Sequence, residues 1–97
     1  MSDTTDLTLR HEPMRRRFVA TTRDGEGILE YSEIDARTLD YNHTFVPREL
    51  RGGGIASKLV AYALDYAQEN GLGVVPSCPF VARYMDQHPE YRELRRP

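Results

Sequence analysis

Three consecutive glycines, residues 52–54, lie between two segments of different periodicity, and this junction restricts the fold more than any other part of the chain. Ahead of it, residues 38–46 (TLDYNHTFV) alternate apolar and polar side chains, which predicts a strand that Pro47 ends. Behind it, apolar side chains recur at helical spacing from Ile55, and the Asn-Gly pair at residues 70–71 is a good helix stop. The sequence therefore predicts a strand, a glycine turn and a helix of about four turns, in that order.

Other segments predict the remaining strands of the sheet and a second helix. Residues 15–22 (RRRFVATT) and 28–34 (ILEYSEI) are rich in β-branched and aromatic side chains and are joined by RDGEG, so they predict a β-hairpin. Beyond the first helix, residues 72–78 (LGVVPSC) predict a short buried strand. Residues 79–88 (PFVARYMDQH) predict a second helix.

The length and charge of the chain bound its class. With 97 residues it has room for one domain with a modest core, which we expect over residues 14–97 behind a polar, partly disordered leader at residues 1–13. The net charge of −2 predicts no general attraction to nucleic acid, and the basic cluster at residues 15–17 is typical of a solvated face. The chain has no apolar run long enough to span a membrane and no secretory signal, so we expect a cytoplasmic protein. Its one cysteine, Cys78, fits a reducing compartment, and no cluster has metal-ligand spacing, so we expect no metal.

The glycine turn has two interpretations. As an anion site, it would present the unpaired amides of the first helical turn, with Arg48, Arg51 and Lys58 adding positive charge. As a joint, it would only give flexibility between strand and helix. A nucleoside triphosphate site is disfavoured because Gly-Lys-Ser/Thr is absent and Ile-Ala follows the last glycine, and the antiparallel strands ahead of the turn disfavour a dinucleotide fold.

The sequence RGGGIA at residues 51–56 matches the Arg/Gln-x-x-Gly-x-Gly/Ala signature of the GNAT superfamily of N-acetyltransferases. A His-Thr strand at residues 43–44 and a Pro-x-Cys-Pro-Phe segment at residues 76–80 make the chain resemble the small single-domain GNAT-like family over residues 31–94. The resemblance implies an α+β fold. It would have a mostly antiparallel sheet and a strand-loop-helix-strand-helix core that binds acetyl-coenzyme A (acetyl-CoA), truncated relative to full-size GNAT enzymes.

By this resemblance, the amides of residues 52–56 bind the pyrophosphate of acetyl-CoA, and Arg51 closes the turn. The pantetheine arm lies between the strand ending at Val46 and the strand ending at Cys78, where a strand amide near Val46 polarises the thioester carbonyl. The residues expected to bind acetyl-CoA are Val46, Arg48, Arg51, Gly52, Gly53, Gly54, Ile55, Ala56 and Lys58.

Cys78, His43 and Tyr84 are the candidate catalytic residues, and each also has a structural interpretation. Cys78 precedes Pro79 and is predicted at a helix N-cap, where the amides would favour a thiolate; the alternative is a buried small hydrophobe. His43 is either a core residue or, by resemblance, a general base or a partner of Cys78. By the same resemblance, Tyr84 would protonate the departing coenzyme A thiolate; the alternative is helix packing.

Three further residues carry no predicted chemistry. His88 and Tyr91 are interpreted as C-terminal packing, and His11 as incidental.

For His43, strand alternation adds a specific expectation, because it predicts a face shared by Leu39, Tyr41, His43 and Phe45.

The predicted function is transfer of an acetyl group from acetyl-CoA to a primary amine. Either His43 deprotonates the amine for direct attack, or Cys78 first takes the acetyl group and gives ping-pong kinetics. Because only RDGEG joins the first two predicted strands, the acceptor side should be open, which suits a protein amine or a partner subunit. The alternatives are a coenzyme A binding or acyl-sensing module without turnover and a structural protein without a ligand. The sequence encodes neither the acceptor nor the oligomeric state.

Overall fold

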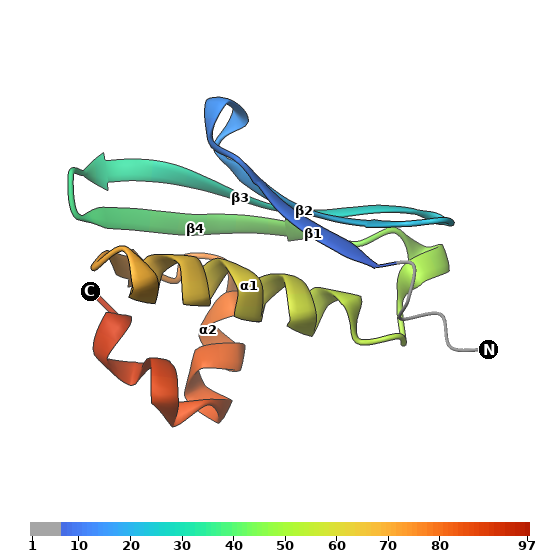
Figure 1. Ribbon diagram of the computed structural model, residues 1–97. Coiled ribbons are helices and arrows are strands. Elements are labelled where there is room, and N and C mark those ends of the chain that lie inside the picture. Colours follow the sequence, from blue (N-terminus) through green and yellow to red (C-terminus); the bar gives the residue numbers. More distant parts are fainter. Residues whose placement is uncertain (1–6) are drawn as a thin grey trace.

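The computed structural model of the protein describes residues 7–97, which form one five-stranded sheet with two α-helices against one face (Figure 1). The strand order is β1-β2-β3-β4-β5; the first four strands are antiparallel, and β5 runs parallel to β4. The elements are β1 (Thr8–Glu12), η2 (Pro13–Arg15), β2 (Arg17–Thr22), β3 (Gly25–Asp35), β4 (Thr38–Phe45), η3 (Arg48–Leu50), α1 (Ile55–Glu69), β5 (Gly73–Val75), α2 (Pro79–Gln87) and η4 (Pro89–Leu94). No helix within residues 7–97 is long and apolar enough to cross a membrane.

The predicted hairpin, third strand, first helix, short strand and second helix are all confirmed. The prediction of a leader over residues 1–13 is wrong for residues 8–12, which form β1 and pair with β2; residues 1–6 lie outside the described residues. The polar sequence of β1 suits an edge strand, because its core-facing Leu9 and His11 alternate with residues that form ion pairs on the other face.

The additional strand β1 changes which two strands the RDGEG segment connects. RDGEG joins β2 to β3, not the first two strands as predicted, while η2 joins β1 to β2. Both connections are short, so no α-helix lies between any of the first four strands.

The core lies between the sheet and the two helices. Phe18 and Leu29 from the sheet pack with Leu59 of α1 and Val81 of α2, and all four are fully buried. Tyr41 is also fully buried, and its hydroxyl donates a hydrogen bond to the Ala63 carbonyl at 2.6 Å. Burial raises the pKa of Tyr41 well above its usual value, so the phenol stays a neutral donor. This bond fixes α1 across β4, and with it the glycine turn at the start of α1.

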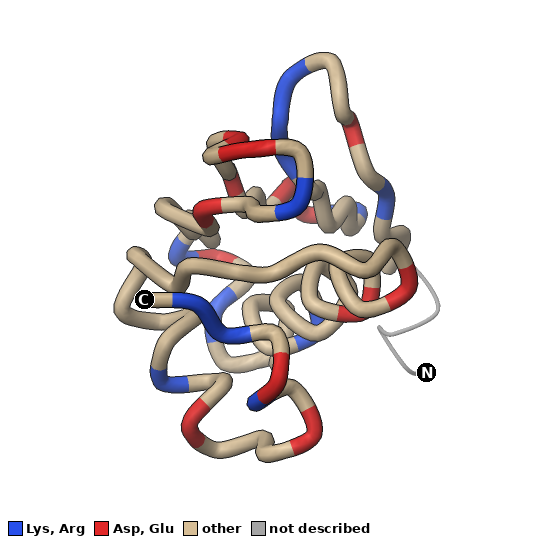
Figure 2. The backbone as a smooth tube through the Cα atoms, turned by 90° about the vertical axis from the view of Figure 1, so that its left-hand side faces the viewer, with Lys and Arg blue, Asp and Glu red and all other residues tan. Residues whose placement is uncertain are grey.

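Within residues 7–97, no α-helix lies on the opposite face of the sheet, and the β1–β2 hairpin rises on this side (Figure 1). Figure 2 shows the basic positions of this hairpin in blue above the acidic positions of the β3–β4 hairpin. Arg17 pairs with Glu12 at 2.6 Å, and Arg10 pairs with Glu12 at 3.0 Å. The Arg17–Glu12 pair ties β1 to β2 across the uncovered face, whereas Arg10 and Glu12 both lie on β1.

His11 is packed rather than incidental. Its ring lies 4.4 Å from the rings of Phe18 and Tyr66, and its Nε2 is 2.7 Å from the Tyr31 hydroxyl. Desolvation by burial lowers the pKa of His11 from its ordinary 6.5. The stability that neutral His11 contributes is therefore fully present above that value and is lost as pH falls through it. We expect the free energy of unfolding to fall between about pH 7.5 and about pH 5.5.

Urea denaturation across this range checks the His11 prediction. A His11→Phe variant keeps the ring packing without the titration, so it should lose less stability than the wild type over the same range. Equal losses in the two proteins would contradict the prediction.

Candidate functional site

The glycine turn presents open backbone amides. Gly52 has φ 90° and Gly54 has φ 77°, in the left-handed region that favours glycine, and a Cβ added at either meets nothing within 4 Å. Gly54 is the N-cap of α1, and the first helical bond runs from the Lys58 amide to its carbonyl at 3.0 Å. The amides before Lys58 have no intrahelical acceptor. The turn therefore combines outward-pointing donors with free space in front of them.

Three basic residues stand near this turn. The Arg51 Nε–H donates to the Val46 carbonyl at 3.0 Å, so Arg51 closes the turn onto the end of β4. Arg48 in η3 and Lys58 in the first turns of α1 are exposed. These charges add to the positive partial charge of the helix N-terminus, so the turn favours an anion.

An opening lies beside the end of β4, because the pairing of β4 with β5 stops before β4 ends. β4 and β5 pair from Thr38↔Gly73 to Asp40↔Val75, and no described strand pairs with the later part of that edge. Pro76 has no amide to continue the ladder. The chain turns instead into α2, whose N-cap amide at Cys78 donates to the Tyr41 carbonyl at 3.0 Å. The end of β4 is thus left unpaired beside the start of α2.

A cavity of about 390 Å³ occupies this opening. Residues 44–46 of the β4 end line it, together with Gly52, Gly54, residues 55–57 of α1 and Phe80 of α2. It runs from the open amides of α1 to the unpaired edge of β4. An anionic group at one end and an extended arm along the strand would both fit its lining.

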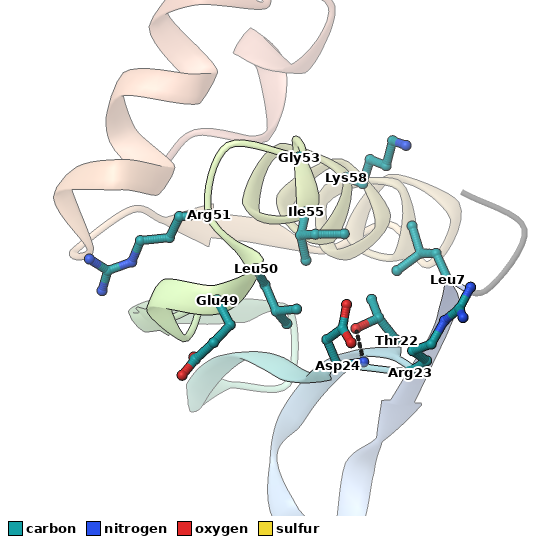
Figure 3. Close-up of a pocket in the computed structure, with 10 residues that line it drawn as sticks. All are labelled: Leu7, Thr22, Arg23, Asp24, Glu49, Leu50, Arg51, Gly53, Ile55 and Lys58. Atoms are coloured by element: carbon teal, nitrogen blue, oxygen red, sulfur yellow. Dashed lines mark hydrogen bonds between the residues drawn. The ribbon is translucent and has the colours of Figure 1, made fainter. Parts of the chain in front are cut away.

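A second cavity of about 180 Å³ lies on the other side of the turn (Figure 3). Leu50 and Ile55 face Thr22 and Asp24 across it, and the guanidinium of Arg51 points away from the other labelled residues. The lining of this cavity mixes the carboxylates of Asp24 and Glu49 with the cations of Arg23, Arg51 and Lys58, and it contains no residue of β4. Of these two cavities, we therefore take the larger, which reaches the unpaired end of β4, as the candidate site.

Cys78 is at the N-cap of α2 with Pro79 at the first helical position, as predicted. Its side chain is 6% exposed and packs within the core cluster. The thiol lies 3.4 Å from the Thr44 hydroxyl, to which it donates, and makes no capping bond to the α2 amides. Cys78 is therefore a core residue that contacts Thr44 of the cavity lining and is not itself part of that lining.

The prediction that His43 shares a face with Leu39 and Tyr41 is wrong, because β4 contains a bulge. Tyr41 pairs with Tyr31 and His43 with Glu30, so one residue of β4, Asn42, has no counterpart on β3. The alternation reverses there, which puts the exposed His43 on the face away from the helices and Thr44 on the face of Cys78. Phe45 follows His43 outward and is 48% exposed. His43 is neither a core residue nor a neighbour of Cys78.

Tyr84 lies one helical turn beyond Phe80 and does not line the larger cavity. Its ring stacks on His88 with centroids 3.8 Å apart, and the His88 Nδ1–H donates to the Tyr84 carbonyl at 2.7 Å. Desolvation, with smaller contributions from two carboxylates, raises the pKa of Tyr84. The Tyr91 hydroxyl donates to Asp65 at 2.7 Å, so the predicted packing roles of His88 and Tyr91 are confirmed.

Sequence reasoning missed five residues that line the larger cavity: Thr44, Phe45, Leu50, Ser57 and Phe80. Thr44 comes beside Cys78 only because of the bulge, and an alternating pattern gives no direct signal for it. Phe80 belongs to the Pro-x-Cys-Pro-Phe segment, but its contact with the cavity depends on the angle at which α2 leaves the sheet. Within residues 7–97, no group of three His, Cys, Asp or Glu side chains could hold a metal ion.

A protein-family model described as GCN5-related N-acetyl-transferase matches residues 17–94. The chain belongs to this family. Members transfer acetyl groups and use acetyl-CoA as co-substrate, so acetyl transfer is the function that membership gives this chain.

Similar proteins cover nearly the same length. Protein NATD1 of Xenopus tropicalis is 29% identical over 98 residues, which cover 99% of this chain and 90% of that protein. Protein NATD1 of Homo sapiens is 30% identical over 92 residues, which cover 93% and 81%. The solution structure of a GCN5-like protein from Staphylococcus aureus has the same fold, with a TM-score of 0.74, 22% identity, and coverage of 95% of this chain and 90% of that one.

Proposed function

We propose that the larger cavity binds acetyl-CoA and that the protein transfers its acetyl group to a primary amine on a protein. One observation carries the proposal: the cavity is continuous from the open amides of α1 to the unpaired edge of β4. The pyrophosphate would accept hydrogen bonds from the amides of residues 52–56, with Arg48, Arg51 and Lys58 adding positive charge. The pantetheine arm would extend along residues 44–46 against Phe80, and a strand amide near Val46 would polarise the thioester carbonyl.

The acceptor would approach from the opposite face of the sheet, where His43 is exposed. His43 would take a proton from the ammonium form of the amine, and the neutral nitrogen would attack the thioester carbon. As the new C–N bond is completed, the C–S bond breaks, and the nitrogen loses its second proton, through water, to the departing coenzyme A thiolate. Tyr84, predicted to protonate that thiolate, stacks on His88 and does not line the larger cavity, so this route does not use it. This direct route uses neither a Cys78 nucleophile nor a Cys78–His43 pair.

Cys78→Ala separates the direct route from the covalent one. The Cys78 thiol is buried, donates to Thr44 and lies on the opposite face of the sheet from His43, so no histidine is positioned to activate it. We expect the variant to keep close to wild-type activity, measured as thiol release from acetyl-CoA with a lysine peptide. Loss of activity, together with an acetylated Cys78 trapped in the wild type by mass spectrometry, would contradict direct transfer.

A second candidate function is a coenzyme A binding or acyl-sensing module without turnover. It is favoured by the position of Tyr84, which stacks on His88 outside the lining of the larger cavity. Time-dependent thiol release in the presence of lysine peptides distinguishes the two functions. Saturable acetyl-CoA binding without release with any peptide would favour the module, whereas release that depends on both protein and peptide supports transfer.

A further inference from the structure

Two half-buried carboxylates lie on the uncovered face of the sheet. Glu30 is half-buried on β3 directly opposite His43, and Asp40 is half-buried on β4 between Ser32 of β3 and Val75 of β5. Within residues 7–97, neither carboxylate forms an ion pair. Arg17 of β2 lies directly across from Glu30, but its guanidinium pairs with Glu12, and Arg10 and Arg16 pair with Glu12, Glu26 and Glu33. Glu30 and Asp40 are therefore carboxylates without an ion pair on the face where His43 is exposed.

Asp40 is the more informative of the two. Its Oδ1 is buried and accepts no hydrogen bond from any described residue. Such an oxygen is costly to leave unpaired, because it has lost water without gaining a donor. Asp40 is also the last residue of β4 that pairs with β5, so it marks the point where the opening beside β4 begins. Rotation of the carboxylate about its soft terminal torsion would turn Oδ1 toward a donor arriving from outside.

The residues around these carboxylates favour a large, extended partner. No α-helix of residues 7–97 covers this face (Figure 1), so it does not enclose a small molecule on all sides. The exposed Asn42 and His43 offer hydrogen bonds, and Phe45, which is 48% exposed, offers an apolar contact on the same face. An exposed arginine, Arg15 in η2, limits the acidic region on the hairpin side.

We propose that Asp40 and Glu30 bind the acceptor, which is a lysine-bearing protein segment with further positive charge beside the reactive lysine. This inference rests on the proposed acetyl transfer. Glu30 would hold the reactive ammonium next to His43, and Asp40 would accept a hydrogen bond from a flanking lysine or arginine. Acetyl-CoA would enter on the helix side of β4, so donor and acceptor would meet at the unpaired strand edge from opposite faces.

The test compares two lysine peptides that differ only in their flanking residues, one with arginines and one with uncharged residues. We expect Asp40→Asn to raise KM for the basic peptide by about three- to tenfold, with little change for the uncharged peptide. We expect Glu30→Gln to raise KM for both peptides by a similar factor, because both carry the reactive lysine. The dependence of KM on salt should weaken in both variants. Glu69→Gln is the matched control, because Glu69 is an exposed carboxylate on α1, on the helix side of the sheet. It should leave both peptides unchanged.

Peptide affinity measured by fluorescence anisotropy tests the surface without requiring turnover. Weaker binding of the basic peptide to Asp40→Asn and Glu30→Gln, but not to Glu69→Gln, supports the acceptor surface even if no acetyl transfer occurs; in that case only the proposed function fails. Unchanged affinity in both variants would overturn the inference. So would equal or faster transfer to free spermidine, because that result would identify a small amine as the acceptor.

Discussion

Replacing Gly54 by glutamate is expected to weaken acetyl-CoA binding by about 100-fold, because a carboxylate would stand at the helix N-terminus where the pyrophosphate is proposed to bind. Gly54 is the N-cap of α1, and the space around its Cα is open, so the new side chain displaces no neighbour. The substitution also strains the backbone at φ 77°, at a cost of about 1–2 kcal/mol. Calorimetric titration with acetyl-CoA measures the affinity, and thermal denaturation measures the strain.

Gly71→Glu provides the control for that strain. Gly71 follows α1 with φ 68°, and a Cβ there also meets nothing within 4 Å, so the substitution adds the same charge and a similar strain at the far end of the same helix. It should lower the melting temperature at least as much as Gly54→Glu, because a carboxylate there also opposes the negative end of the helix dipole, while leaving acetyl-CoA affinity intact. Similar acetyl-CoA affinity in the two variants would make the glycine turn a joint rather than an anion site.

The elements around the glycine turn could be predicted because their signals are local. The apolar spacing from Ile55 and the Asn-Gly stop fix α1 within the chain itself, and its observed bounds are Ile55–Glu69. β1 could not be predicted in this way. Its sequence TLRHE is polar because one of its faces is covered by ion pairs across to β2 and β3, and such partners appear only after the strands are paired.

The catalytic side of the site could be predicted only in part. The N-cap position of Cys78 followed from Pro79, which is a local signal. The orientation of His43 did not follow, because one extra residue at Asn42 reverses every later side chain of β4. The consecutive polar residues Asn42 and His43 are compatible with a bulge, but the same pair also occurs in regular strands. The register with β3 decides between them, and register is a non-local property.

The bulge at Asn42 places His43 on the uncovered face, where the proposed mechanism makes it the general base. We expect His43→Gln to lower kcat/KM for a lysine peptide by about 100-fold, the usual contribution of a positioned general base. The defect should shrink as pH rises toward about 10, where lysine loses its own proton and needs no base. Acetyl-CoA affinity should be unchanged, because His43 and the larger cavity lie on opposite faces of β4. Rates over a pH series, with calorimetry at one pH, measure both.

His11→Gln is the matched control for His43→Gln, because it makes the same chemical change on β1, against the helix side of the sheet. It should lower stability without a pH-dependent loss of kcat/KM at temperatures where the variant is folded. If His43→Gln instead loses acetyl-CoA affinity and leaves the pH profile unchanged, His43 supports the cofactor side of β4 and is not the base. A pH-dependent defect confined to His43→Gln would mean that the amine is deprotonated on the uncovered face, and that the bulge is what aims the base at the acceptor.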